Sequence, residues 1–92
     1  MTDDTLPRMA EAVALLESRD WQAAHEIVQS DSSALGSWAH GIVHLIEGDI
    51  SNAGYWYRKA DRALDQDADL DTYVSAEIAA LRAAIQASSA SQ

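Results

Sequence analysis

Two short segments of this chain repeat one pattern, and the repeat limits the folds that are open to it. Asp20 and Asp49 are each followed at once by a large apolar residue, and each has an alanine four positions later. An aspartate before an apolar run is a helix N-cap signal, because its carboxylate accepts hydrogen bonds from the free N–H groups of the first turn. Each segment therefore predicts a helix that starts directly after a turn.

Five helices and no strand are expected along the chain, because alternating β-branched segments are missing. The single proline, Pro7, suits the opening turn of a helix, where its missing N–H costs little. Gly48 is expected to end a helix in the left-handed conformation. The expected helices run from Thr5 to Ser18, from Asp20 to the linker at Ser30, from Leu35 to Glu47, from Asp49 to Leu64, and from Asp71 to about residue 87.

The last expected helix has the clearest apolar stripe of the five. The stripe consists of Leu70, Val74, Ile78, Leu81 and Ile85. Asp71 is its expected N-cap, and its polar side, which includes Glu77, is expected to face water at the exposed end of the fold. Residues 88–92 have nothing to bury, so we expect a disordered tail after an ordered core of about 5–87 in a single domain, 1–92.

Composition excludes several classes of protein. Fifteen acidic and six basic residues give a net charge of −9, which disfavours nucleic acid and anionic membrane as partners. Because the chain has no cysteine, disulfides, thiolate catalysis and cysteine-based zinc sites are excluded. The acidic N-terminus is not followed by an apolar run, and no apolar stretch is long enough to span a bilayer. A cytoplasmic protein is therefore expected.

The segment from Leu35 to Leu64 resembles a tetratricopeptide repeat, whose period of about 34 residues is close to the 29-residue spacing of the two caps. The residues that carry the resemblance are Gly41, Gly48, Asp49, Ala53, Tyr57 and Ala60. His40 and His44 stand where that family has apolar or aromatic residues, and the proline after the second helix is absent. The resemblance implies an all-α fold of two stacked helical hairpins plus a C-terminal capping helix. It also implies close packing at Gly41 and Ala53, which Tyr57 covers.

The stretch from Trp38 to Arg58 also resembles small bacterial proteins without an assigned function, and that likeness implies no activity. Tetratricopeptide-like domains usually present a surface to another protein, although a fold alone does not determine a function.

A polar stripe lies on the otherwise apolar helix expected at 35–47. It consists of Ser37, His40, His44 and Glu47. The stripe is either the side that an otherwise apolar helix turns to water, or a buried one, to which the repeat register points. If it is buried, three interpretations are open: histidines hydrogen-bonded to Asn52, Tyr55 or Tyr57; a polar binding pocket; or a metal site. His40 and His44 are four residues apart, which lets two imidazoles share a metal ion, with Glu47 or the distant His25 as a third ligand. The interpretation as buried, hydrogen-bonded histidines, which we call the structural interpretation, is favoured, so no metal and no cofactor is assigned.

Three consecutive aromatic residues, Tyr55, Trp56 and Tyr57, stand on the helix that follows Asp49. Adjacent helical residues point about 100° apart, so at least one ring is expected at the surface or in a groove. The cations next to them complement a helix C-terminus and need no ligand. These cations are Arg58, Lys59 and Arg62.

The resulting prediction is a non-catalytic module that binds another protein or peptide, a second copy of the chain included, through a groove lined by Trp38 and Tyr55. The alternative is a small-molecule or metal pocket, with acid–base catalysis by histidine as one form of it. The residues of that pocket would be His40, His44, Glu47, Asn52, Tyr55 and Arg58. No catalytic residue is assigned, because neither a nucleophile elbow nor a phosphate-binding loop is present.

Overall fold

The computed structural model describes residues 5–90, which form five helices, as the sequence predicts. They are α1 (Thr5–Glu17), α2 (Trp21–Val28), α3 (Ala34–Glu47), α4 (Ile50–Lys59) and α5 (Leu70–Ala90). No strand occurs between residues 5 and 90, and the all-α class is confirmed. Within the same range, none of the helices is both long and apolar enough to cross a membrane.

The two repeated segments form equivalent turns. The carboxylates of Asp20 and Asp49 each accept a hydrogen bond from the backbone N–H three residues further on, at 3.2 and 3.3 Å. The residue before each cap is left-handed: φ is 65° at Arg19 and 93° at Gly48. Arg19 takes this conformation although it has a β-carbon, which normally disfavours it. The hairpins α1–α2 and α3–α4 therefore turn in the same way.

Close packing of α3 against α4 depends on Gly41. A β-carbon at this position would overlap the ring of Tyr57 and would lie 3.4 Å from the carbonyl oxygen of Ala53. Ala53 is completely buried, and Tyr57 is 1% exposed. The predicted packing of Gly41, Ala53 and Tyr57 is thus confirmed.

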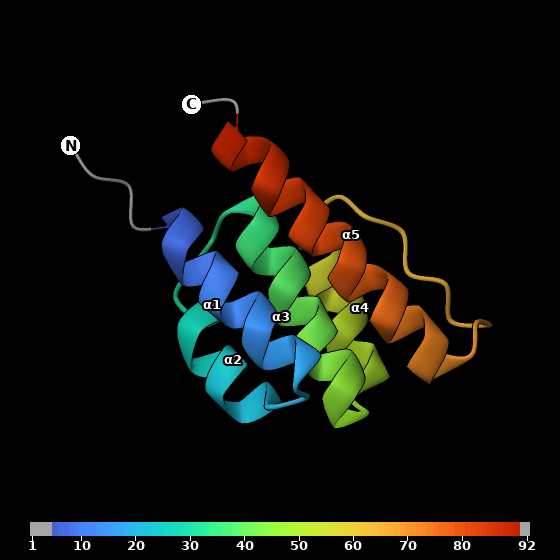
Figure 1. The fold of residues 1–92 in the computed structure, drawn as a ribbon. Helices are drawn as coiled ribbons and strands as arrows, with labels where there is room; N and C mark the ends of the chain where they lie inside the picture. The colour runs from blue at the N-terminus through green and yellow to red at the C-terminus, as the bar shows by residue number, and fades with distance from the viewer. Residues whose placement is uncertain (1–4, 91–92) are drawn as a thin grey trace.

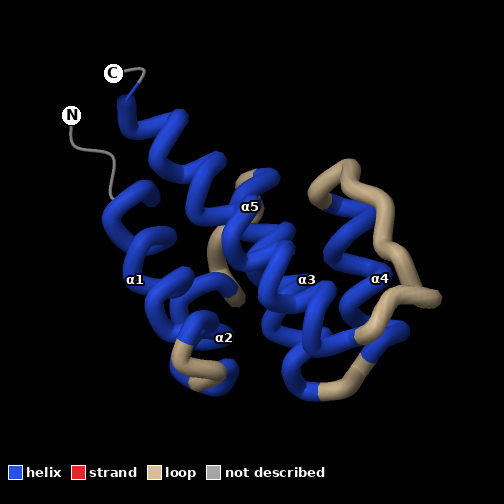
Figure 2. Tube along the Cα trace, turned by 45° about the vertical axis from the view of Figure 1, so that its right-hand side comes forward, coloured by secondary structure: helices blue, strands red, loops and turns tan. Residues whose placement is uncertain are grey.

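Helix α5 lies across the face that α1 and α3 share. In Figure 1 it runs antiparallel to α1, so that the start of α1 and the end of α5 lie at the same end of the molecule. The segment 60–69, tan on the right of Figure 2, leads back along α4 before α5 begins. The backbones of α4 and α5 therefore stay apart, and the last helix of the chain packs on the first.

Helix α4 ends at Lys59 and not at the predicted Leu64, because Asp61 takes the left-handed conformation, with φ 59°, that ends a helix. Both ends of α5 also differ from the prediction. Its N-cap is Asp69 and not Asp71, because the Asp69 carboxylate accepts from the backbone N–H and the hydroxyl of Thr72, at 3.1 and 2.8 Å. Asp71 lies in the first turn instead. At the other end α5 continues to Ala90, so residues 88–90 are helical where disorder was expected. Residues 1–4 and 91–92 of the predicted domain lie outside the described range.

One core connects all five helices. Apolar side chains from all of them are buried together, and the apolar stripe predicted for α5 supplies four, Val74, Ile78, Leu81 and Ile85. Leu70, the first residue of that stripe, is 42% exposed. On the surface, the Arg82 guanidinium of α5 pairs with the Glu17 carboxylate of α1, with one nitrogen–oxygen distance of 2.8 Å.

Candidate functional site

Three histidines come together on one side of α3. His40 and His44 lie one helical turn apart on α3, and α2 brings His25 against both of them. The His25 ring centroid lies 4.7 Å from that of His40 and 5.6 Å from that of His44. One ligating atom of each ring lies within 4.8 Å of the other two. We refer to His25, His40 and His44 as the histidine cluster.

The three rings differ in burial and in hydrogen bonding. His40 and His44 are 4% and 7% exposed, whereas His25 is half-buried. Nδ1 of His44 shares a hydrogen bond with Oε1 of Glu47 at 2.8 Å. Nδ1 of His40 is buried and has no hydrogen-bond partner within residues 5–90. A buried polar atom without a partner is rare, because it loses its bond to water and gains nothing in return.

The hydrogen bonds expected for the structural interpretation are not formed. Among the described residues, neither Asn52 nor Tyr55 bonds a histidine, and the Tyr57 hydroxyl points to Glu77 instead. The stabilising partner of His44 is Glu47, from its own helix. The interpretation of His40 as a hydrogen-bonded core histidine is therefore wrong.

Aromatic residues of α4 close another side of the histidine cluster. The Trp56 ring stacks on His40 with a centroid distance of 3.8 Å and an interplanar angle of 10°. The Lys59 ammonium lies 5.2 Å from the centroid of Trp56 and 5.7 Å from that of Tyr55. Tyr55 is 48% exposed and Tyr57 is buried, which confirms that the three consecutive rings cannot all face one core.

The environment of His40 favours its neutral form. Burial, together with a smaller effect of the nearby His25 and His44 rings in the same direction, lowers the pKa of His40 to about 4. A metal ion binds neutral imidazole, so this ring is ready to coordinate at neutral pH without first losing a proton.

The predicted groove at Trp38 is filled by α5. Trp38 is 5% exposed, and its indole N–H donates to Oε1 of Glu77 at 3.1 Å. The same oxygen accepts from the Tyr57 hydroxyl at 2.8 Å. The Arg62 guanidinium lies 3.5 Å from the Trp38 ring centroid and 3.7 Å from Oε2 of Glu77. Glu77, expected to face water, is thus part of a polar contact between α3, α4 and α5.

The remaining predicted site residues do not belong to the histidine cluster. Arg58 is exposed, Asn52 is half-buried, and within residues 5–90 neither bonds the cluster. Glu47 is exposed and reaches the cluster only through His44. The sequence missed how close His25 lies, because the crossing of α2 over α3 is a tertiary contact that no local pattern encodes.

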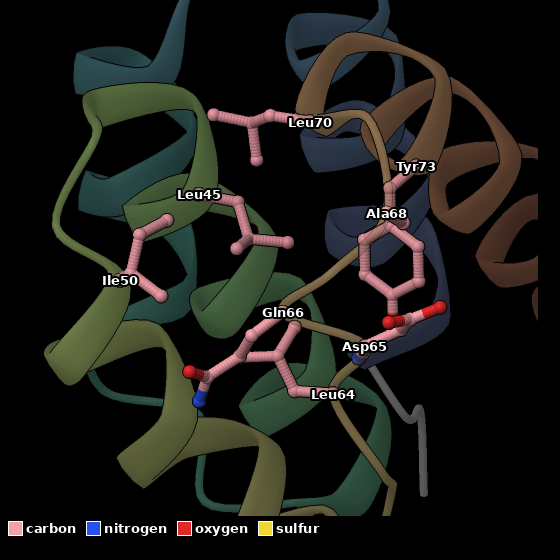
Figure 3. Close-up of a pocket in the computed structure, with 8 residues that line it drawn as sticks. All are labelled: Leu45, Ile50, Leu64, Asp65, Gln66, Ala68, Leu70 and Tyr73. Atoms are coloured by element: carbon pink, nitrogen blue, oxygen red, sulfur yellow. The ribbon is translucent and has the colours of Figure 1, made fainter.

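Figure 3 shows a second feature, a cavity between the start of α5 and the ends of α3 and α4 that meet at the Gly48 turn. No residue of the histidine cluster lines this cavity.

Comparison of the chain with protein-family models, with curated proteins and with solved structures finds no match.

Proposed function

We propose that this chain binds a divalent transition metal ion through His25, His40 and His44. The observation that carries the proposal is the convergence of three imidazoles whose ligating atoms lie within 4.8 Å of one another. One of these rings also has a buried nitrogen without a partner in the described part of the chain. Three imidazole ligands suit zinc, nickel and copper.

Glu47 supports this proposal from outside the cluster. Histidines that bind a metal usually hydrogen-bond a carboxylate through their other ring nitrogen, which fixes the orientation and raises the basicity of the ring. The bond between His44 Nδ1 and the Glu47 carboxylate has this form. Three protein ligands leave at least one coordination position of a tetrahedral ion for a small molecule from solution.

The site needs only a small adjustment to accept an ion. Zn–N bonds are about 2.0–2.1 Å long, so ligating nitrogens of a tetrahedral ion lie about 3.3–3.4 Å apart. His25 is half-buried on the short helix α2, whereas His40 and His44 are buried. Rotation of this one side chain is the change that we expect on binding.

Titration calorimetry with zinc chloride and with nickel chloride tests the proposal. We expect one ion per chain, a His25→Ala variant that no longer binds, and a control variant on the same helix, Glu26→Ala, that binds as the parent does. Since outer carboxylates contribute 10–100-fold to affinity, Glu47→Gln is expected to bind more weakly by that factor. Absence of binding in the parent chain, or undiminished binding in His25→Ala, would overturn the proposal.

The protein-interaction module predicted from the sequence stays a prediction. Its groove at Trp38 is covered by α5, and Tyr55 is the aromatic residue that still offers an exposed surface. We give the metal site precedence, because its residues converge on one point.

A further inference from the structure

A cavity of about 180 Å³ lies beneath the segment that joins α4 to α5. Its walls are mainly aliphatic: Leu45 from α3, Ile50 from α4, Leu64 and Ala68 from the connecting segment, and Leu70 from α5. In Figure 3 these side chains point toward one another across the space, and the ring of Tyr73 forms another wall.

The cavity exists because the backbones of α4 and α5 stay apart. The connecting segment spans the gap and is tied to α5 by Tyr73, whose hydroxyl accepts from the backbone N–H of Asp65 at 3.3 Å and donates to the carbonyl of Ala63 at 3.4 Å. The Asp65 carboxylate in turn accepts from the N–H of Asp67 at 3.0 Å. Hydrogen bonds thus help to hold the roof in place above the space.

The size and the walls of the cavity define the body of a ligand. An apolar cavity of about 150 Å³ stays dry and takes up benzene, so a space of this volume fits one six-membered ring with a short side chain. The phenol of Tyr73 is already engaged with the roof. Shape and burial of apolar surface would therefore provide the affinity.

The charges around the cavity define the head of the ligand. Asp65 lines the cavity itself, and a neighbouring depression that shares Leu45 and Leu70 with it is lined by Asp69 and Asp71. Among residues 5–90, none of these three carboxylates forms a salt bridge. A cation is attracted to such a group of carboxylates and an anion is repelled.

One cation, Arg19, also lines the neighbouring depression. Its guanidinium already donates to the carbonyl of Leu16 and to the hydroxyl of Ser75, both at 3.0 Å. It is thus held toward α1 and α5, and the net charge of the whole chain is −9. Three carboxylates and one guanidinium thus line the cavity and the depression, so acidic side chains outnumber basic ones there.

We propose that this cavity binds a small organic amine whose compact apolar body enters between Leu45, Leu64 and Leu70 while its positive head stays near Asp71. This site is separate from the histidine cluster and does not depend on metal binding.

Three probes of equal length test the proposal: 2-phenylethylamine, 2-phenylethanol and phenylacetate, each titrated at pH 7 and followed by protein-detected NMR. We expect the amine to bind at least 5-fold more tightly than phenylacetate, with the alcohol between them, and shifts centred on Leu45, Leu64 and Leu70.

Two variants separate the contribution of the apolar body of the ligand from that of its charged head. Ala68→Leu fills the cavity and is expected to weaken the amine and the alcohol at least 10-fold, whereas the control Ala83→Leu, on the exposed side of α5, leaves both unchanged. Asp71→Asn is expected to weaken the amine alone. Circular dichroism checks that each variant is folded. The proposal is overturned if no probe binds, if phenylacetate binds as tightly as the amine, or if Ala68→Leu binds as the parent does.

Discussion

Gly41 and His40 are neighbours in the chain, and the role of each follows from the atoms that surround its side-chain position. At Gly41 the space is taken by the Tyr57 ring, so that even a methyl group has no room. The His40 ring has a neighbouring indole and two other imidazoles, but its buried nitrogen has no hydrogen-bond partner among residues 5–90. The first residue fixes the distance between two helices, and the second supplies one ligand of the proposed metal site.

Gly41→Ala is expected to destabilise the fold by about 1–3 kcal/mol, because the Tyr57 ring must move out of a packed core. Gly54→Ala is the matched control on α4: its new β-carbon would make only ordinary contacts, the nearest at 3.5 Å to the Arg58 guanidinium. Alanine then gains about 0.5–1 kcal/mol in helix propensity. Urea unfolding measures both, and equal effects of the two substitutions would contradict this account of Gly41.

Protonation of His40 is expected to destabilise the fold in acid. Its pKa is about 4 in the folded chain and about 6.5 when unfolded, so the unfolded chain binds the proton more readily between these values. The fold therefore loses stability as the pH falls from about 6.5 to 4. The total loss is about 3 kcal/mol, because one pKa unit corresponds to about 1.4 kcal/mol.

Urea unfolding of the parent chain and of His40→Phe between pH 7 and pH 4 isolates this contribution, because the carboxylates titrate alike in both proteins. The parent is expected to lose about 3 kcal/mol more than the variant over this range. The same loss in both proteins would show that His40 does not titrate as described.

At the scale of helices, Glu77 joins three elements through one carboxylate. Trp38 of α3 and Tyr57 of α4 both donate to its Oε1, and Arg62 of the connecting segment lies near its Oε2. Burial and the bond to Glu77 raise the pKa of Tyr57 well above its usual range, so the phenol stays a donor at every pH at which the fold is stable. This contact connects α4 and α5, whose backbones stay apart.

Glu77→Ala is expected to destabilise the protein by about 2–4 kcal/mol, because it leaves the buried donors of Trp38 and Tyr57 without a partner. Glu26→Ala, at an exposed position of α2, is the control and is expected to change stability by less than about 0.5 kcal/mol. Thermal unfolding followed by circular dichroism compares the two. If the Glu77→Ala protein is as stable as the control, the Glu77 contact does not help to hold α5 in place.

At the scale of the whole molecule, metal binding and stability are linked. An ion that binds only the folded chain is expected to add about 2.7 kcal/mol to the free energy of unfolding at a concentration 100 times its dissociation constant. Differential scanning calorimetry with and without zinc measures the shift in Tm. His25→Ala is expected to show no shift, and an equal shift in that variant would place the ion elsewhere on the chain.

The sequence predicts the hairpins well because short-range chemistry determines them. Asp20, Asp49 and Gly48 act within one turn of their own position, and their pattern is readable in a few letters. The place of α5 is harder to predict, because its apolar stripe fits the end of the stack as well as the face of α1 and α3. The same limit applies to the site: the histidine pair on α3 is visible as a spacing of four, whereas His25 and Glu77 reach their partners only through the packing of helices.

The contact between α1 and α5 has a consequence for how the chain comes apart. In open helical arrays each repeat touches only its neighbours, so the ends fray before the middle. Here the two terminal helices support each other, and neither can peel away without exposing the apolar face of the other. The chain is therefore expected to unfold as one cooperative unit, and amide hydrogens in α1 and α5 to exchange almost as slowly as those in α3.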